Sequence, residues 1–270
     1  MTIGHDGSEG HLKTVRHGKR AGGLLLLLLC CVSTGACADP PQADAEALLK
    51  SAYDNWRASS STTEVRMTVH RPSWERVLEL KSWTQGDDHA LVRFTAPARD
   101  ANNATLKVGD DTWVFNPKLN QVIKLPTSML AQSWMGSDFS YDDLAKSDDI
   151  LVRYTHKISA VIKKDDHLVY NIEATPKAGA PVVWGKRLVE VRDDGVMLGE
   201  SFFDQDMKLV RSMKTEEVAT IGGRPYPKTM TMRPAGDADS WTQTETISGR
   251  FNEGLPEYLF TISNLQNKRD

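Results

Sequence analysis

Cysteine is scarce in this 270-residue chain, which has only three, Cys30, Cys31 and Cys37, all near the N-terminus. From Asp39 to the C-terminus there is none. That part of the chain therefore has no disulfide, no thiolate metal site and no cysteine nucleophile. A domain of this length buries enough surface to be stable without cross-links.

An excess of positive charge is also lacking. The formal net charge is −3 at pH 7, and charged residues make up 26% of the chain. Proteins that bind nucleic acid neutralise its phosphates with clustered lysine and arginine, and the sequence contains no such basic stripe. We therefore expect no nucleic-acid partner.

Recognisable catalytic motifs are absent as well. The sequence has no Gly-x-Ser-x-Gly elbow, no phosphate-binding glycine loop and no His-Glu-x-x-His motif. His70, His89, His156 and His167 stand alone in predicted strands or turns, so we interpret them as surface imidazoles. The sequence predicts a protein that is not an enzyme and that uses no cofactor.

Three acidic residues, Asp138, Asp142 and Asp143, lie close together in the middle of the chain. A cation site or an acid–base role is one interpretation. The ligand spacing of a calcium-binding loop is missing, however. We therefore favour a solvated loop or a helix cap, and we expect no metal.

The N-terminus has the three parts of a secretory signal. Basic residues precede an apolar run from Leu24 to Val32, and small residues follow. The apolar run is too short to span a bilayer as a stable helix, which needs roughly 20 residues. We predict a signal peptide over residues 1–38, cleaved before Asp39, and a single domain over residues 39–270. An imperfect lipobox ending at Cys37 leaves a second possibility, a lipoprotein anchored through that cysteine.

Hydrophobic periodicity predicts a mostly β protein. Ala43 to Arg57 has the spacing of a helix, and from Glu64 onward apolar residues alternate with polar ones, with a turn signal every 8–12 residues. Val92 and Phe94 share one face of a strand over Ala90 to Thr95. Further strands are predicted at 104–108, 111–116, 121–125, 152–164, 168–174, 182–192, 196–204, 208–219, 228–233 and 241–247. A final segment, Leu255 to Leu265, begins with a helical turn at Pro256.

One segment interrupts this pattern. Pro126 to Met135 is predicted to form a second helix, which Gly136 ends in the left-handed conformation. One large sheet must bury one face, and the few helices are its only cover. We therefore predict an α+β fold, mostly β, in which helices lie across the concave apolar face of a curved antiparallel sheet.

Aromatic and sulfur-containing side chains gather around that second helix. Trp113 and Phe115 lie two residues apart on one strand and so share a face. We predict that they face one apolar space together with Met129, Leu130 and Trp134. An ordinary core and a ligand cavity both remain open, because methionine suits irregular apolar surfaces of either kind.

Three stretches resemble the outer-membrane lipoprotein-sorting family, and more closely its LolA-like branch of uncharacterised periplasmic proteins. They are Trp113–Pro117, Val122–Pro126 and Ser133–Leu144, and the run Gly-Ser-Asp-Phe-Ser-Tyr-Asp-Asp from Gly136 to Asp143 is the most specific part. The late Pro-Tyr-Pro-Lys from Pro225 to Lys228 fits too, so the resemblance covers about Ala43 to Leu265.

The resemblance implies an unclosed, strongly curved β-barrel with helices as a lid over an apolar cavity. It also implies a periplasmic carrier of lipoprotein acyl chains or other lipids towards the outer membrane. A non-catalytic accessory subunit of an envelope lipid or efflux transporter is the alternative. The expected ligand-binding residues of the cavity and lid are Phe94, Trp113, Phe115, Met129, Leu130, Trp134, Met135 and Phe139.

Overall fold

The computed structural model describes residues 44–145 and 149–269. Contacts divide the chain into the units Met1–Pro41 and Gln42–Asp270, and every described residue belongs to the second unit. The predicted signal peptide, its cleavage before Asp39 and the acylation of Cys37 lie outside the described residues.

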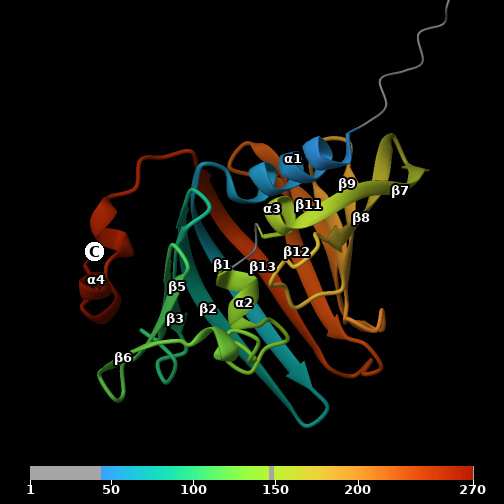
Figure 1. The fold of residues 1–270 in the computed structure, drawn as a ribbon. Coiled ribbons are helices and arrows are strands. Elements are labelled where there is room, and N and C mark those ends of the chain that lie inside the picture. The colour runs from blue at the N-terminus through green and yellow to red at the C-terminus, as the bar shows by residue number, and fades with distance from the viewer. Residues whose placement is uncertain (1–43, 146–148, 270) are drawn as a thin grey trace, which may run out of the picture. The chain divides into compact units, whose positions relative to one another are not determined.

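Most of the second unit is one antiparallel sheet of thirteen strands (Figure 1). The strand order is β6-β5-β4-β3-β2-β1-β13-β12-β11-β10-β9-β8-β7. Two meanders thus meet where β1 pairs with β13, and β6 and β7 form the two edges. The strands are β1 (Ser60–Arg71), β2 (Trp74–Gln85), β3 (His89–Ala96), β4 (Ala104–Val108), β5 (Asp111–Asn116), β6 (Gln121–Lys124), β7 (Tyr154–Lys164), β8 (His167–Pro176), β9 (Lys186–Arg192), β10 (Met197–Phe203), β11 (Leu209–Ile221), β12 (Arg224–Pro234) and β13 (Trp241–Phe251).

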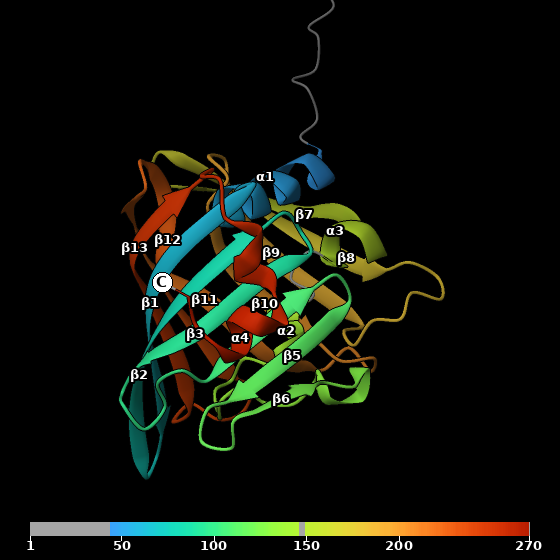
Figure 2. The same ribbon diagram turned by 90° about the vertical axis from the view of Figure 1, so that its left-hand side faces the viewer.

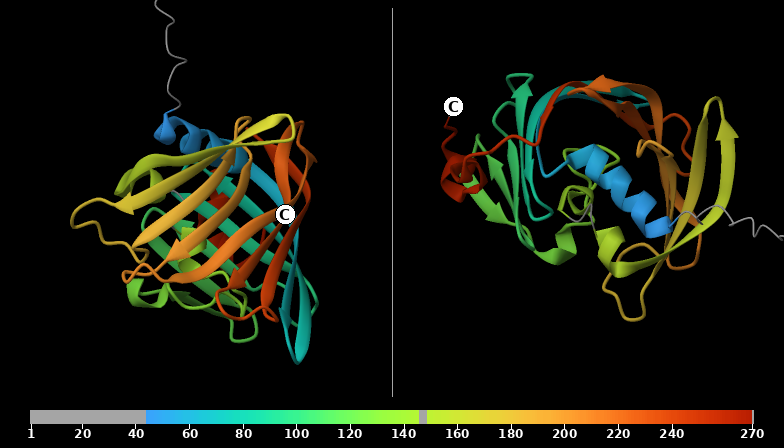
Figure 3. Two further views of the ribbon diagram at one scale, coloured as in Figure 1. Left: turned by 90° about the vertical axis from the view of Figure 1, so that its right-hand side faces the viewer. Right: turned by 90° about the horizontal axis from the view of Figure 1, so that it is seen from above.

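The sheet curves and does not close. The right-hand view of Figure 3 shows it bending around α1 (Ala45–Arg57), while the left-hand view shows how steeply the strands twist. Since twist accumulates from strand to strand, a sheet of this width curls on itself. The predicted fold, a curved and unclosed antiparallel sheet with helical cover on its concave side, is confirmed.

The helical segments are short apart from the first. α1 buries Leu49, Ala52 and Tyr53 against the sheet, and the Asp44 side chain caps it by accepting a hydrogen bond from the Glu46 backbone N–H at 3.0 Å. The others are η1 (Thr127–Met129), α2 (Tyr141–Ala145), α3 (Asp149–Arg153), η2 (Glu257–Phe260) and α4 (Ile262–Gln266), and α1 spans Ala45–Arg57.

Apolar side chains form three clusters on the two faces of the sheet. On the concave face, one lies beneath α1 and α3 and includes Leu49 and Met232, and another lies around Trp134. The third lies on the convex face, beneath the C-terminal segment with η2 and α4. Figure 2 shows this segment crossing the outer surface of the sheet near β3 and β5.

The predicted second helix over Pro126 to Met135 is wrong. Only the 3-10 turn η1 forms, and Ser133 then makes an isolated antiparallel bridge with Ser140. Met135 and Gly136 both have positive φ, 53° and 76°, so they turn the chain within the loop that this bridge closes. Gly136 does take the predicted left-handed conformation, but it serves this turn and ends no helix.

Candidate functional site

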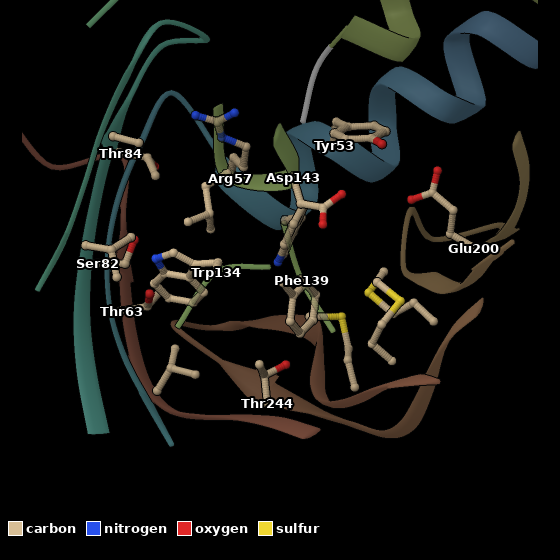
Figure 4. A pocket seen from close by; sticks show the side chains of 18 of the residues that line it. Tyr53, Arg57, Thr63, Ser82, Thr84, Trp134, Phe139, Asp143, Glu200 and Thr244 are labelled. Carbon is tan, nitrogen blue, oxygen red and sulfur yellow. The ribbon is translucent and has the colours of Figure 1, made fainter. Parts of the chain in front are cut away.

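A large cavity lies between the concave face of the sheet, the underside of α1 and the segment Trp134–Leu144. Its empty space measures about 1460 Å³, part of it open to solvent. Figure 4 shows 18 of the side chains that line it.

One wall of the cavity is apolar and rich in sulfur. Met213, Met230 and Met232 project inward from β11 and β12, where Met213 lies opposite Met232 in the register. Phe139 and Trp134 approach from the loop that crosses the sheet (Figure 4). Flexible thioether side chains adapt to irregular partners, so this wall suits a ligand of variable shape.

Trp134 lines the cavity and is held against β3 and β4. Its indole Nε1–H donates to Thr105 Oγ1 at 3.2 Å, and its ring lies 5.1 Å from that of Phe94. The side chain is 4% exposed. A buried indole needs a partner for its single N–H, and Thr105 on β4 supplies it.

The opposite wall carries hydroxyl groups. Ser61 and Thr63 on β1 face Thr84 and Ser82 on β2, and all four line the cavity. The Ser61 and Thr84 hydroxyl oxygens are 2.7 Å apart, a hydrogen bond in which either is the donor. The four residues lie on the same face of β1 and β2 as the apolar residues Met67 and Leu80 further along these strands.

A buried ion pair stands at the end of the cavity beneath α1. Arg187 Nε donates to Glu200 Oε1 at 2.5 Å, and Arg187 Nη2 donates to the Tyr53 hydroxyl at 3.0 Å. Burial opposes the charged guanidinium, but the carboxylate of Glu200 outweighs it and raises the pKa of Arg187 above its ordinary value. Burial raises the pKa of the nearby Tyr154 to about 12, so this phenol stays neutral at physiological pH.

Two arginines anchor the loop that carries Phe139. Arg71 donates to both carboxylate oxygens of Asp138, at 3.1 and 2.9 Å, and the Thr242 hydroxyl donates to the same carboxylate at 2.7 Å. Arg211 donates to the Asp138 carbonyl at 2.8 Å and to Asp143 Oδ1 at 2.5 Å. These bonds to positively charged partners favour the loop interpretation of Asp138 and Asp143 over a cation site.

Asp143 also caps the start of α2. Its carboxylate accepts from the Ser140 backbone N–H at 2.7 Å, while the Ser140 hydroxyl accepts from the Asp143 N–H at 3.3 Å. This reciprocal pair is a capping box for α2. The Ser-x-x-Asp spacing that encodes it is visible in the sequence.

The structure separates the eight predicted ligand-binding residues. Trp134 and Phe139 line the large cavity. Phe94, Phe115 and Met135 border a second, smaller space of about 520 Å³ beside β5. Met129 on η1 is 36% exposed, and Leu130 is buried without lining either space.

Trp113 and Phe115 do not share the space of Trp134, and the prediction that they do is wrong. They share a face, as expected, but it is the convex one, where they pack with Leu106 under Leu259 and Phe260. The alternation of side chains along a strand shows which of them share a face, but not which face of the sheet that is. A segment some 140 residues later decides it by covering that face.

The hydroxyl wall and the three methionines were missed by the sequence reasoning. Their signal was present: Ser61, Thr63, Ser82 and Thr84 hold positions that alternate in step with buried apolar residues of the same strands. Polar side chains at strand positions that otherwise carry buried apolar residues indicate that these positions face a cavity and not a packed core.

One group of side chains on the surface has the composition of a cation site. His167, Asp193 and Asp194 place one potential ligand atom each within 4.8 Å of one another. His167 Nδ1 lies 2.6 Å from Asp193 Oδ1, and Arg192 holds Asp194 with two hydrogen bonds at 2.8 and 2.7 Å. These ion pairs account for the geometry of the turn between β9 and β10 without a metal. Across residues 44–145 and 149–269, no helix is long and apolar enough to cross a membrane.

Comparisons with known proteins agree with this architecture. A family model that describes uncharacterised proteins matches residues 86–267, which is well over half of the chain. No curated protein matches the chain by sequence.

Solved structures show the same fold. A DUF1329 family protein from Desulfovibrio piger is 23% identical, with a TM-score of 0.73 over 82% of this chain and 97% of its own. A LolA superfamily protein from Nitrosomonas europaea is 22% identical, with a TM-score of 0.68 over 82% of this chain and 98% of its own. A putative outer-membrane lipoprotein-sorting protein domain from Vibrio parahaemolyticus is 20% identical, with a TM-score of 0.69 over the same shares.

The matched residues include β3 to β13 and the Gly136–Asp143 run that carried the resemblance. The unclosed sheet and its concave cavity agree with it. This chain therefore belongs to the family of uncharacterised proteins that the family model describes, and its fold is similar to that of the DUF1329 and LolA superfamily structures.

Proposed function

We propose that this protein is a periplasmic carrier that holds the acyl chain of a lipoprotein, or of another lipid, in the concave cavity and delivers it towards the outer membrane. The observation that carries the proposal is the cavity itself, with its wall of Met213, Met230 and Met232. The LolA-like fold adds support, since two neighbours of similar fold are named for this superfamily or for lipoprotein sorting.

The energetics of such a carrier need no covalent chemistry. Burying an acyl chain gains about 0.8 kcal/mol per CH₂ group. Ten buried CH₂ groups would therefore contribute on the order of 8 kcal/mol, which suffices for reversible binding at micromolar concentration. Release then requires an acceptor that offers the chain a comparable apolar surface.

The alternative, an accessory subunit without a ligand, predicts a cavity plugged by its own side chains. Trp113, Phe115 and Met129 are large side chains that could form such a plug, and none of them lines the cavity. The space between the two walls therefore favours the carrier over the accessory subunit.

Native mass spectrometry of the exported protein, purified without detergent, tests the proposal. We expect a fraction of the protein to carry one lipid, which organic solvent releases for identification. A delipidated sample reloaded with a monoacylglycerol serves as the control for survival of the complex in the instrument. A purified protein that carries no lipid, and that also fails to take up the added one, would contradict a carrier role.

A further inference from the structure

The two walls of the cavity differ in chemistry, and the difference bears on the ligand. Methionines and Phe139 line one side, and a row of hydroxyls, with Trp134 beside it, lines the other (Figure 4). Thr63 and Ser82 are direct cross-strand partners, as are Ser61 and Thr84. The row therefore follows the β1–β2 ladder and is a continuous strip.

Part of this strip lacks hydrogen-bond partners. Ser61 and Thr84 bond to each other, but within the described part of the chain the Thr63 and Ser82 hydroxyls have no protein partner. On the adjoining strand β13, Thr244 also lines the cavity, and its buried Oγ1 has no partner among the described residues.

Hydroxyls placed in this way disfavour a purely hydrocarbon ligand. A hydroxyl buried without a partner costs about 1–3 kcal/mol. An alkyl chain that displaced the water from this wall would leave Thr63 and Ser82 in that state, in which Thr244 Oγ1 already is. Valine or alanine would fill the same inward positions without the penalty: Val65 lies further along β1, and Val92 on β3 lies opposite Ser82.

We infer that the cavity takes an amphiphile with a neutral acyl-ester segment, whose carbonyl oxygen accepts hydrogen bonds from Thr63 and Ser82. The chain then lies along Met213, Met230 and Met232. The inference rests on the proposed carrier function and narrows its ligand to one class, an acyl chain joined to its head through an ester. No charged head group is required, because Arg187 and Arg211 are already engaged by Glu200 and Asp143.

The test compares two probes on the same protein. An uncharged naphthylamine dye reports apolar binding alone, and monododecanoylglycerol, measured by displacement of the dye, adds the ester. The variants are Thr63→Val and Ser82→Ala, which remove a hydroxyl at nearly constant volume. The matched control is Thr68→Val on the same strand, between the inward-facing Met67 and Val69 and so on the other face.

We expect each wall variant to bind monododecanoylglycerol with about fivefold lower affinity, the equivalent of roughly 1 kcal/mol for one lost hydrogen bond. Dye affinity stays unchanged, and Thr68→Val changes neither. Equal affinities of wild type and both wall variants for the ester would overturn the inference and leave the carrier function standing. If the wild type binds neither dye nor ester, the carrier function fails and takes the inference with it.

Discussion

Phe139 connects the two apolar clusters on the concave face. It packs against both the cluster beneath α1 and the cluster around Trp134, and its ring also lines the cavity. It is half-buried. The neighbouring Asp138, by contrast, points to Arg71 and Thr242 and anchors the backbone. Under the proposed function, Phe139 therefore serves ligand binding, and its neighbour Asp138 serves the architecture of the loop.

At this scale we predict opposite effects for the two neighbours. Phe139→Ala should lower the free energy of unfolding by less than the ~3–5 kcal/mol typical of a fully buried phenylalanine. It should nevertheless weaken the binding of the naphthylamine dye. Asp138→Asn should cost about 1.5–3 kcal/mol through its charged hydrogen bonds and leave dye binding measurable. Urea unfolding and dye titration check both, with the exposed Asp166→Asn as the control. If Asp138→Asn abolished binding while Phe139→Ala changed nothing, the segment would be a polar site and its anchoring role secondary.

At the scale of elements, the C-terminal segment covers the part of the convex face formed by β3 to β6. Leu265 on α4 is fully buried, and the Arg93 guanidinium donates from the sheet to the Asn264 and Leu265 carbonyls at 2.7 and 3.1 Å. Trp113 and Phe115 lie in the same cluster. This cover is independent of the cavity, because the sheet separates the two.

We therefore expect Leu265→Ala to destabilise the protein by about 2–5 kcal/mol, the usual cost of a large-to-small change at a buried leucine. Dye affinity should not change, since the mutated side chain lies on the other face of the sheet. Ile262→Ala on the same helix is the control, because Ile262 is 46% exposed. Loss of dye binding by folded Leu265→Ala protein would show that the two faces are coupled.

The strands were predictable and the crossing loop was not. The bounds of β4 and β5 agree with the predicted strands 104–108 and 111–116, because alternation and the Gly109–Asp110 turn are local signals. The segment 126–135 has helix-like apolar spacing, but its conformation depends on Arg71 and Arg211, which hold the following loop from strands far away in sequence. The placement of Trp113 and Phe115 failed for the same reason, since a distant segment decides which face is covered.

At the scale of the whole described unit, the cavity is a space that a large side chain can occupy. Ala90 on β3 faces it next to Thr84 and is 8% exposed. We expect Ala90→Trp to fold, with a cost of about 1–3 kcal/mol from crowding, and to lose most of its dye and lipid binding. Native mass spectrometry would then show less co-purified lipid than in wild type. The outward Thr68→Trp is the control, and undiminished lipid in Ala90→Trp would place the binding elsewhere.

The sheet has two free edges, β6 and β7, and no ladder joins them. A closed barrel has a fixed circumference, so its interior widens only when hydrogen bonds between strands break. An open sheet can widen without breaking hydrogen bonds. Small changes of twist, spread over twelve strand pairings, move its edges apart while every ladder stays intact. The upper size of a cargo would then be set by the bending stiffness of the sheet, and a thick or branched chain would be admitted at a cost that rises gradually with its girth.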